Sequence, residues 1–292
     1  MYGLAAASTW PHFGASMRTK TMRPLLILLP LSALLPATLR AQADVVFVAT
    51  PMEVVIGMLN LAGVSERDVV YDMGSGDGRI VIAAAKHYRA RGVGVDIDSI
   101  LIEESRRSAD TAGVGALVEF RRGDLFATDL REATVVTLYL GRALNERLQP
   151  NLYRDLRPGS RVVSQNFDMG DWEPDSIVMV RGRNFGETPV HLWLIPADAA
   201  GNWTVTLEGG TEAPSHFPLS LEQRYQKLSG NPRAHGRLRG NQITLTVDGG
   251  GRTLTLAGTV EGDTAGGTAR WKDGSSLRWK ATRPPRPEAR RP

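Results

Sequence analysis

Three glycines at alternate positions, Gly74, Gly76 and Gly78, follow an apolar run in the segment VVYDMGSGDGRI (residues 69–80). A P-loop would need a lysine followed by Ser or Thr after its last glycine, and this segment has no lysine. A dinucleotide-binding loop would need glycine or alanine three positions after its second glycine, where this chain has Arg79. Because glycine lets the backbone approach a ligand closely, the segment predicts a ligand-binding loop of neither phosphate-binding type.

An acid stands two positions before the first glycine. Asp72 would oppose a pyrophosphate, which binds where a helix N-terminus attracts negative charge. A carboxylate there favours a small cationic ligand, and S-adenosylmethionine has an ammonium group, a sulfonium group and no phosphate. Asp96, twenty residues after Gly76, is expected to end a second strand, where its two acceptor oxygens could take both ribose hydroxyls.

A third strand is expected to end near Asp124, which Leu125 and Phe126 follow. The Asp124 carboxylate could accept a hydrogen bond from the adenine amino group while its apolar neighbours pack on the ring. Each acid alone could be an ordinary strand-end cap or a solvated carboxylate. Three acids at three successive strand ends, together with the glycine loop, favour S-adenosylmethionine as the bound cofactor.

Candidates for contact with a methyl acceptor follow the next two predicted strands. Tyr139 ends the fourth strand, and Asn166 and Asp168 follow the fifth. Trp172 could wall a pocket and hold an alkylammonium. Plainer interpretations stay open: Tyr139 as a core aromatic, Asn166 as a turn residue and Trp172 as packing. GRALN follows the fourth strand in place of Asn/Asp-Pro-Pro-Tyr, which argues against DNA adenine or glutamine as the acceptor.

Other chemistries lack their residues in this sequence. The chain has no cysteine, which excludes disulfides, thiolate zinc sites and a cysteine nucleophile. Its five histidines show no metal-ligand spacing, so no metal site is expected.

Alternating strand and helix patterns must position these residues. Thr50, Pro51 and Glu53 form a capping-box pattern with proline at the first helical position, and helical spacing continues to Gly63. Strands joined by helices predict a mostly parallel sheet, and the last two strands, which follow each other without a helix, predict a hairpin with an antiparallel strand. Strands are expected at 68–73, 92–97, 117–124, 133–140 and 161–167 and in SIVMVRG and VHLWLIPA, and helices at 79–90, 99–112 and 142–156.

The sequence texture changes from about residue 200. Period-two alternation with glycine-rich turns predicts an antiparallel all-β module over 200–283, either a small barrel or a sandwich. Its core is expected to hold Trp203, Trp271 and Trp279. The predicted fold class is therefore α/β, a Rossmann-like seven-strand sheet over 44–199 followed by this module. The last nine residues, 284–292, are rich in Pro and Arg and are predicted to be disordered.

The two predicted parts carry opposite net charges. Residues 44–199 hold 17 Lys and Arg against 23 Asp and Glu, whereas 200–292 hold 14 against 8. The arginines of the module could recruit an acidic protein, an anionic membrane surface or nucleic acid. Because no basic motif with interleaved aromatics is present, an ordinary soluble surface is the favoured interpretation, and nucleic acid is not expected as a partner.

Residues 1–43 have the pattern of a secretory signal peptide. Basic residues lie near position 20, an apolar stretch spans 25–39, and Ala41 and Ala43 form an A-x-A cleavage site. The apolar stretch is shorter than the roughly 20 residues that span a bilayer, so no transmembrane helix is expected in the mature chain. The pattern predicts export, to the periplasm in a bacterium, with translation starting at Met1 or Met17; an uncleaved anchor or a mitochondrial presequence is the alternative.

Residues 46–197 resemble the class I S-adenosylmethionine-dependent methyltransferases. YDMGSGDGRIVIAAAK is an extended form of their first motif, and Trp172-Glu173-Pro174-Asp175 is similar to a late W-x-P-D motif of the protein-lysine methyltransferases of the ATP synthase c-subunit type. The resemblance implies that Asp96 holds the ribose and Asp124 the adenine. It also assigns the methionine end of the cofactor to the first motif, through Asp72, Gly74, Ser75, Gly76 and Gly78.

Three functional hypotheses follow. The first is a methyltransferase that acts on a protein lysine, with an accessory β-module. The second is a small-molecule methyltransferase, and the third is an exported protein that binds the cofactor without turnover. An exported enzyme would need a supply of a cofactor that is made in the cytoplasm.

Overall fold

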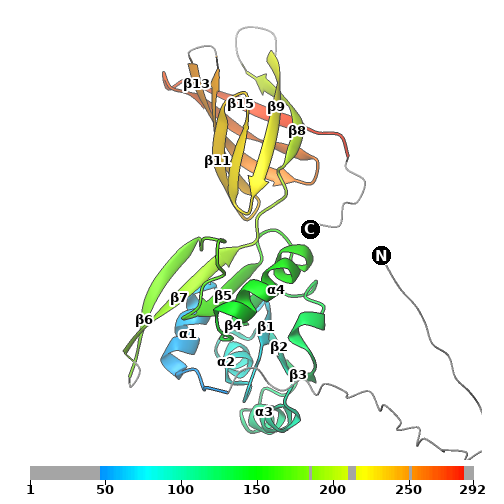
Figure 1. Ribbon diagram of the computed structural model, residues 1–292, viewed down its shortest axis with the longest axis vertical. Coiled ribbons are helices and arrows are strands. Elements are labelled where there is room, and N and C mark those ends of the chain that lie inside the picture. Colours follow the sequence, from blue (N-terminus) through cyan, green and yellow to red (C-terminus); the bar gives the residue numbers. More distant parts are fainter. Residues whose placement is uncertain (1–46, 184–185, 210–214, 250–251, 286–292) are drawn as a thin grey trace, which may run out of the picture. The chain divides into compact units, whose positions relative to one another are not determined.

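The computed structural model describes residues 47–285 except for short gaps at 184–185, 210–214 and 250–251 (Figure 1). The predicted signal peptide 1–43 and most of the predicted disordered tail 284–292 lie outside the described residues. The described residues all belong to one compact unit. In the described ranges, no helix combines the length and the apolar character needed to cross a membrane.

A seven-stranded sheet forms the first part of the described chain, in the order β3-β2-β1-β4-β5-β7-β6. β1 to β5 are parallel, whereas β7 runs antiparallel to both β5 and β6. The predicted hairpin and its antiparallel strand are therefore confirmed. The strands are β1 (Val69–Met73), β2 (Arg91–Asp96), β3 (Val118–Arg122), β4 (Val135–Leu138), β5 (Arg161–Gln165), β6 (Ser176–Gly182) and β7 (Gly186–Leu194).

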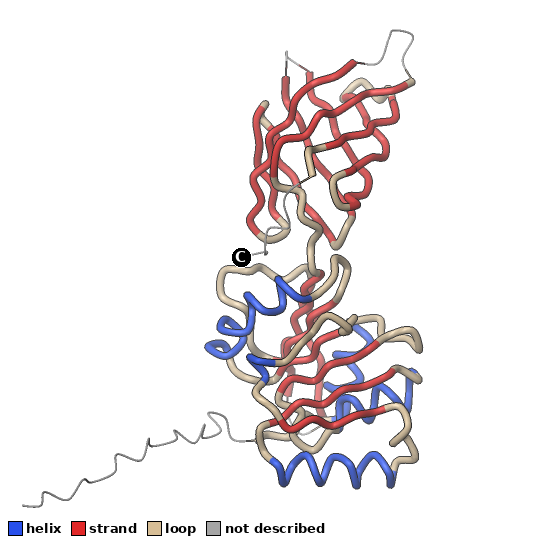
Figure 2. The backbone as a smooth tube through the Cα atoms, turned by 90° about the vertical axis from the view of Figure 1, so that its right-hand side faces the viewer, coloured by secondary structure: helices blue, strands red, loops and turns tan. Residues whose placement is uncertain are grey.

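Helices cover both faces of this sheet (Figures 1 and 2). Side chains of α1, α2 and α3 form one hydrophobic cluster with the sheet, and those of α4 form another. The strands alternate between the two clusters: Val70 of β1 belongs to the first and Tyr71 to the second, as the two-residue period of a strand requires. The helices are α1 (Met52–Leu61), α2 (Arg79–Tyr88), α3 (Ser99–Thr111) and α4 (Arg142–Asp155), and a 3-10 turn, η1, covers Leu125–Ala127.

The start of α1 differs from the prediction. Pro51 occupies the N-cap position rather than the first helical position, and no side chain caps the helix. Thr50 instead donates its hydroxyl hydrogen to Oε1 of Gln165, at the end of β5, at 2.8 Å. The capping box is wrong because a buried acceptor far along the chain takes the hydroxyl that the local motif would use. At α3 a side chain does cap the helix, since Asp98 accepts from the Ile100 amide at 2.7 Å.

The second part of the chain is a closed antiparallel barrel in the order β10-β11-β12-β13-β14-β15-β8-β9. The pairing of β15 with β8 and of β9 with β10 closes it, which decides between the barrel and the sandwich. The strands are β8 (Gly201–Glu208), β9 (Ser215–Arg224), β10 (Lys227–Asn231), β11 (Ala234–Arg239), β12 (Gln242–Gly249), β13 (Arg252–Glu261), β14 (Thr264–Trp271) and β15 (Ser276–Thr282).

Side chains fill the inside of the barrel. Trp203 and Trp279 are buried there, as predicted. Trp271 is only partly buried, and the Arg252 guanidinium lies 4.3 Å from its ring centre. The apolar lining leaves a cavity of about 10 Å³, which is room for about one water molecule. An eight-stranded barrel can hold a small ligand or be packed solid, and this one is packed.

Candidate active site

The glycine loop after β1 adopts a backbone that other residues avoid. Gly74, Gly76 and Gly78 have φ values of 81°, 54° and 77°, in the left-handed region that glycine enters without strain. A Cβ on Gly78 would lie 2.5 Å from the Phe120 ring. The amide of Gly74 donates to the Val95 carbonyl of β2 at 2.8 Å. The loop therefore bends toward β2 and begins α2 with bare backbone.

Asp72 lies buried at the end of β1, just before this loop. Its side chain is 3% exposed, and Oδ1 accepts a hydrogen bond from Thr137 of β4 at 2.7 Å. Burial raises the pKa of Asp72 to about 7; the Thr137 hydrogen bond acts against this, and the negative charges of Asp96 and Asp77 add to it. A cation placed beside the carboxylate would reverse the shift, so the environment of Asp72 favours a positively charged ligand.

Asp96 ends β2 and faces the glycine loop. Its Oδ2 accepts from the Gly76 amide at 2.8 Å, and its Oδ1 accepts from the Asp98 amide at 3.0 Å. Each carboxylate oxygen has a further lone pair. The carboxylate is therefore oriented by the protein and keeps acceptor capacity for a pair of hydroxyls, while its ribose-binding role stays a prediction.

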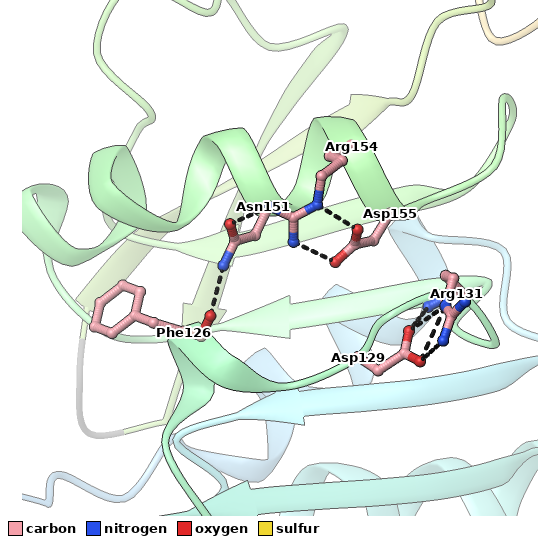
Figure 3. Close-up of polar contacts among 6 residues, drawn as sticks. All are labelled: Phe126, Asp129, Arg131, Asn151, Arg154 and Asp155. Atoms are coloured by element: carbon pink, nitrogen blue, oxygen red, sulfur yellow. Dashed lines mark hydrogen bonds and ion pairs between the residues drawn. The ribbon is translucent and has the colours of Figure 1, made fainter. Parts of the chain in front are cut away.

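Asp124 follows β3 and is exposed. Its Oδ1 accepts from the Phe126 amide at 2.8 Å, which caps η1. Asn151 of α4 holds the same turn by donating to the Phe126 carbonyl at 2.8 Å (Figure 3). Arg147 lies over the Phe126 ring, 3.8 Å from its centre. Sequence reasoning found Asp124, Leu125 and Phe126 but missed the two α4 residues, because their spacing carries no signal before α4 is placed on this turn.

Ser75 provides an independent test of whether a ligand fits the loop. Its hydroxyl is buried and has no hydrogen-bond partner among the described residues, and such a group costs about 1–3 kcal/mol until a partner arrives. A bare loop, an unpartnered hydroxyl and a buried carboxylate three positions before it in the chain suit a ligand with both polar and cationic groups. The residues present fit S-adenosylmethionine on these three observations.

The segment before α1 lies over the glycine loop. A Cβ on Gly76 would collide with the Phe47 ring. Arg79 of α2 ties this segment down, because its Nη1 donates to the Thr50 carbonyl at 2.9 Å while its Nε donates to Asp77 at 2.9 Å. Sequence reasoning gave Arg79 and Asp77 no role, although both lie inside the motif.

The candidate acceptor residues lie at the ends of β4 and β5. The Tyr139 ring stacks on the Phe167 ring, with centroids 6.1 Å apart and planes 24° apart. Asn166 is exposed and has a φ of 66°, and its backbone N–H donates to the Pro189 carbonyl at 2.8 Å. Asp168 Oδ1 accepts from the Gly170 amide at 3.0 Å. The structure thus brings Tyr139 next to the loop that carries Asn166 and Asp168, with Phe167 between them.

Asn145 of α4 holds this loop in place, a role that no sequence pattern indicates. Its side chain is fully buried, and Nδ2 donates to the carbonyls of Phe167 and Asp168, both at 3.2 Å, and to Ser164 Oγ at 3.0 Å. Asp168 also lies near Arg142, whose Nε is 3.4 Å from Oδ1.

Trp172 does not wall a pocket. Its side chain is fully buried against the rings of Tyr153, Trp193 and Tyr225, and Trp193 Nε1 donates to its carbonyl at 2.7 Å. A ring enclosed by other aromatics offers no face to an alkylammonium. The plainer interpretation of Trp172 as packing is the right one.

Comparisons with known proteins match the sheet part of the chain. The sequence model of the ANTKMT methyltransferase domain matches residues 72–176. A protein-lysine N-methyltransferase of Saccharolobus islandicus is 42% identical over 150 residues, which are 51% of this chain and 92% of that protein. The adenine nucleotide translocase lysine N-methyltransferase of Mus musculus is 32% identical over 44% of this chain, and the match spans about half of its length, 54%. A solved structure described as an RNA methyltransferase from Salinibacter ruber, in complex with S-adenosyl-L-homocysteine, is 54% identical over 52% of this chain and 95% of that one, with a TM-score of 0.49.

Proposed function

The chain belongs to the S-adenosylmethionine-dependent methyltransferases, in the family that includes protein-lysine N-methyltransferases, and we propose that it methylates a lysine side chain of a protein. The structural observation that supports a lysine acceptor is the stacked pair of Tyr139 and Phe167 at the ends of β4 and β5. Its two rings offer an apolar lining for the methylene stem of a lysine. The archaeal relative, a protein-lysine methyltransferase matched over nearly its whole length, supports the same acceptor.

The sheet order supports binding of the cofactor at the ends of β1, β2 and β3 and of the acceptor at the ends of β4 and β5. Ligands of open α/β sheets bind beyond the carboxyl ends of the strands. We assign the methionine end of the cofactor to Asp72 and the glycine loop after β1, the ribose to Asp96 after β2, and the adenine to Asp124 and Leu125 after β3. Since β4 and β5 continue the sheet on the other side of β1, the acceptor enters from their side.

Positioning is the main contribution of the protein to this reaction. When bound, the cofactor supplies a methyl group on a positively charged sulfur for in-line transfer to a nitrogen lone pair. A lysine amine must first lose its proton, and apolar walls such as Tyr139 and Phe167 lower the pKa of an ammonium by desolvation. Asn166 and Asp168, which flank Phe167, are the candidates for receiving the amine by hydrogen bonding.

A labelled-methyl experiment tests the proposal. Purified full-length protein and methyl-labelled S-adenosylmethionine are added to an extract of the native cell, which is then separated into protein, RNA and small molecules. We expect label in protein, recovered after acid hydrolysis as methyllysine. Label found only in RNA, the acceptor class of the S. ruber protein by its description, or only in small molecules overturns the lysine proposal. Cofactor binding by calorimetry with no label in any fraction would favour a non-catalytic binding protein.

We also propose that the protein is exported, on the signal-like pattern of residues 17–43. The amino-terminal sequence of the protein purified from its native cell tests this. A mature chain beginning at Asp44 is expected, and a chain beginning at Met1 or Met17 overturns the proposal. The same result shows in which compartment the cofactor must be supplied.

A further inference from the structure

The turn between β9 and β10 of the barrel contacts the loop that follows β5. We call residues 223–227 the barrel tip and residues 166–175 the acceptor loop. The ring of Tyr225 stacks on that of Trp172, with centroids 5.3 Å apart and planes 12° apart. The Tyr225 hydroxyl donates to Asp171 Oδ1 at 2.9 Å, and Gln226 Nε2 donates to the Glu173 carbonyl at 2.6 Å. The contact thus combines a ring stack with hydrogen bonds to side chain and backbone.

Opposite charges meet along the same contact. Residues 171–175 of the acceptor loop have an acid at every second position, and each of these three acids pairs with a cation of the barrel. Arg224 pairs with Asp171, Lys227 with Glu173 at 2.6 Å, and Arg237 of β11 with Asp175 at 3.1 Å. The three acids belong to residues 44–199, which carry a net negative charge, and the three cations belong to residues 200–292, which carry a net positive charge. The Arg224–Asp171 and Lys227–Glu173 pairs are exposed, and exposed ion pairs are worth less than about 1 kcal/mol each, so these two orient the contact more than they hold it. The carboxylate of Asp175 is buried, with a side chain 3% exposed.

Tyr225 is the anchor of the barrel tip. It has a φ of 53°, a left-handed conformation that costs a non-glycine residue roughly 1–2 kcal/mol and persists where surrounding contacts enforce it. The ring joins the hydrophobic cluster of the α4 face and closes over Trp172, which has no exposed surface. Gln223 supports the turn by donating to the Tyr225 carbonyl at 2.8 Å and to the Tyr153 hydroxyl at 3.1 Å.

We propose that the barrel is a positioning element of the active site. Its tip holds the second half of the acceptor loop, while Asn145 of α4 holds the first half through the Phe167 and Asp168 carbonyls. The loop is clamped from both ends, and Phe167 stays stacked on Tyr139. Tyr225 is a positioning residue that acts through Trp172. The link to acceptor binding rests on the proposed function, whereas the clamp itself does not.

Two measurements on the full-length protein test the clamp through Tyr225→Ala. The first is hydrogen exchange at the Gly170 and Trp172 amides, whose acceptors lie inside the acceptor loop. We expect roughly tenfold faster exchange there, with no change at the Gly74 amide. The second is the kinetics of methyl transfer to the labelled protein: KM for the acceptor rises or kcat falls several-fold, and the dissociation constant for S-adenosylmethionine stays within about twofold.

Matched variants separate positioning from general damage. Tyr225→Phe keeps the stacked ring and is expected to restore both readouts to wild-type levels. Arg252→Ala removes a barrel cation that pairs with Asp273 and lies over Trp271, away from the tip, and leaves both readouts unchanged. If Tyr225→Ala does not fold, the double variant Arg224→Ala/Lys227→Ala, which removes two exposed ion pairs, is expected to raise loop exchange about two- to threefold.

Unchanged exchange at Gly170 and Trp172 in Tyr225→Ala, or in the double variant where that one fails to fold, overturns the clamp. An equal loss of cofactor binding and methyl transfer also overturns it, because that pattern means general destabilisation. The exchange readout needs no acceptor. If the wild-type protein transfers label to no protein at all, the lysine proposal fails, but hydrogen exchange at Gly170 and Trp172 still tests the clamp.

Discussion

The two halves of the sheet use their buried polar groups differently. On the cofactor side, the Ser75 hydroxyl has no partner among the described residues, and Asp72 has a pKa raised by burial. On the acceptor side, one amide nitrogen of Asn145 serves two backbone carbonyls and a hydroxyl, and Gln165 accepts from Thr50. On the cofactor side these groups surround the glycine loop, whereas on the acceptor side Asn145 Nδ2 and Gln165 hold parts of the protein itself in place. Asn145 Oδ1, Trp172 Nε1 and His191 Nδ1 on the acceptor side also lack a partner among the described residues. We expect substitutions in the two halves to separate cofactor binding from acceptor methylation.

The largest separation is expected from Asp96→Ala. The variant loses the carboxylate that accepts from the Gly76 amide and, on the proposed ribose assignment, two charge-assisted hydrogen bonds to the cofactor. We therefore expect S-adenosylmethionine binding to weaken by about 2 kcal/mol or more, roughly 30-fold. Isothermal calorimetry measures the dissociation constant directly.

Asp98→Ala is the matched control for Asp96→Ala. Asp98 caps α3 through the Ile100 amide, so its loss should lower the free energy of unfolding by about 1 kcal/mol and leave the dissociation constant unchanged. If Asp96→Ala binds the cofactor as wild type does, the ribose lies elsewhere and the division between the halves is wrong.

Two asparagines of α4 offer a crossed test within one helix. Asn145→Ala frees the Phe167 and Asp168 carbonyls and should slow acceptor methylation by roughly tenfold, since a misplaced acceptor loop costs productive geometry, with cofactor affinity unchanged. Asn151→Ala frees the Phe126 carbonyl in η1 (Figure 3) and should weaken cofactor binding about threefold. For each variant, steady-state kinetics measures the rate of acceptor methylation and calorimetry measures the dissociation constant for S-adenosylmethionine.

The two halves would not be separate if both asparagine variants changed cofactor binding and methylation equally, or if each changed the property expected of the other. If Asn145→Ala weakens cofactor binding as much as it slows methylation, the two halves are not separable. A thermal melt of each variant serves as the control, because a loss of fold lowers both readouts together.

The cofactor half could be predicted from sequence because its contacts follow the chain order of strand ends. Gly76 meets Asp96 twenty residues on, at the spacing of one strand–helix–strand unit. The fold class followed from the same alternation. Thr137 was missed because a threonine inside a buried strand looks like any β-branched residue until β4 is known to pair with β1.

The acceptor half could not be predicted in the same way. Asn145 meets its loop only after α4 packs on the sheet, and Trp172 is buried by a ring 53 residues further along the chain. The strand β9 was not foreseen, since Pro218 interrupts its pattern and proline normally marks an edge or an end of a strand. Because the barrel tip lies at the turn between β9 and β10, its ion pairs with the acceptor loop could not be inferred from the opposite net charges of the two parts.

The pKa of Asp72 predicts a pH effect confined to the cofactor half. On the proposed assignment of Asp72 to the methionine end of the cofactor, only the ionised carboxylate would attract the ammonium group. With a pKa of about 7, we therefore expect binding to tighten by roughly eightfold between pH 6 and pH 7.5. The raised pKa has a second consequence with the opposite sign. The protonated carboxyl stabilises the ligand-free fold at low pH, and this contribution is lost as the pH rises from about 4 toward 7.

Calorimetry across pH 6 to 7.5 and thermal melts of the ligand-free protein test both signs. In Asp72→Asn the cofactor affinity should be weaker and nearly independent of pH in this range, and the pH-dependent loss of stability should be smaller. A pH profile shared by wild type and Asp72→Asn would show that another group controls binding.

Ser75→Ala is expected to have the smallest effect and the most diagnostic sign. The wild-type hydroxyl is buried without a partner in the described part of the chain, so its removal should leave the ligand-free protein equally stable or slightly more stable. On the proposed assignment of Ser75 to the cofactor, the same change removes a hydrogen bond to the ligand, and we expect binding to weaken about threefold to tenfold, about 1 kcal/mol. Thermal melts and calorimetry on one preparation measure both. A polar group kept for a ligand yields opposite signs in the two measurements, whereas one that holds the protein together, as Asn145 does, lowers stability when it is removed. If Ser75→Ala loses stability and keeps its cofactor affinity, Ser75 belongs with Asn145, and the difference between the two halves disappears.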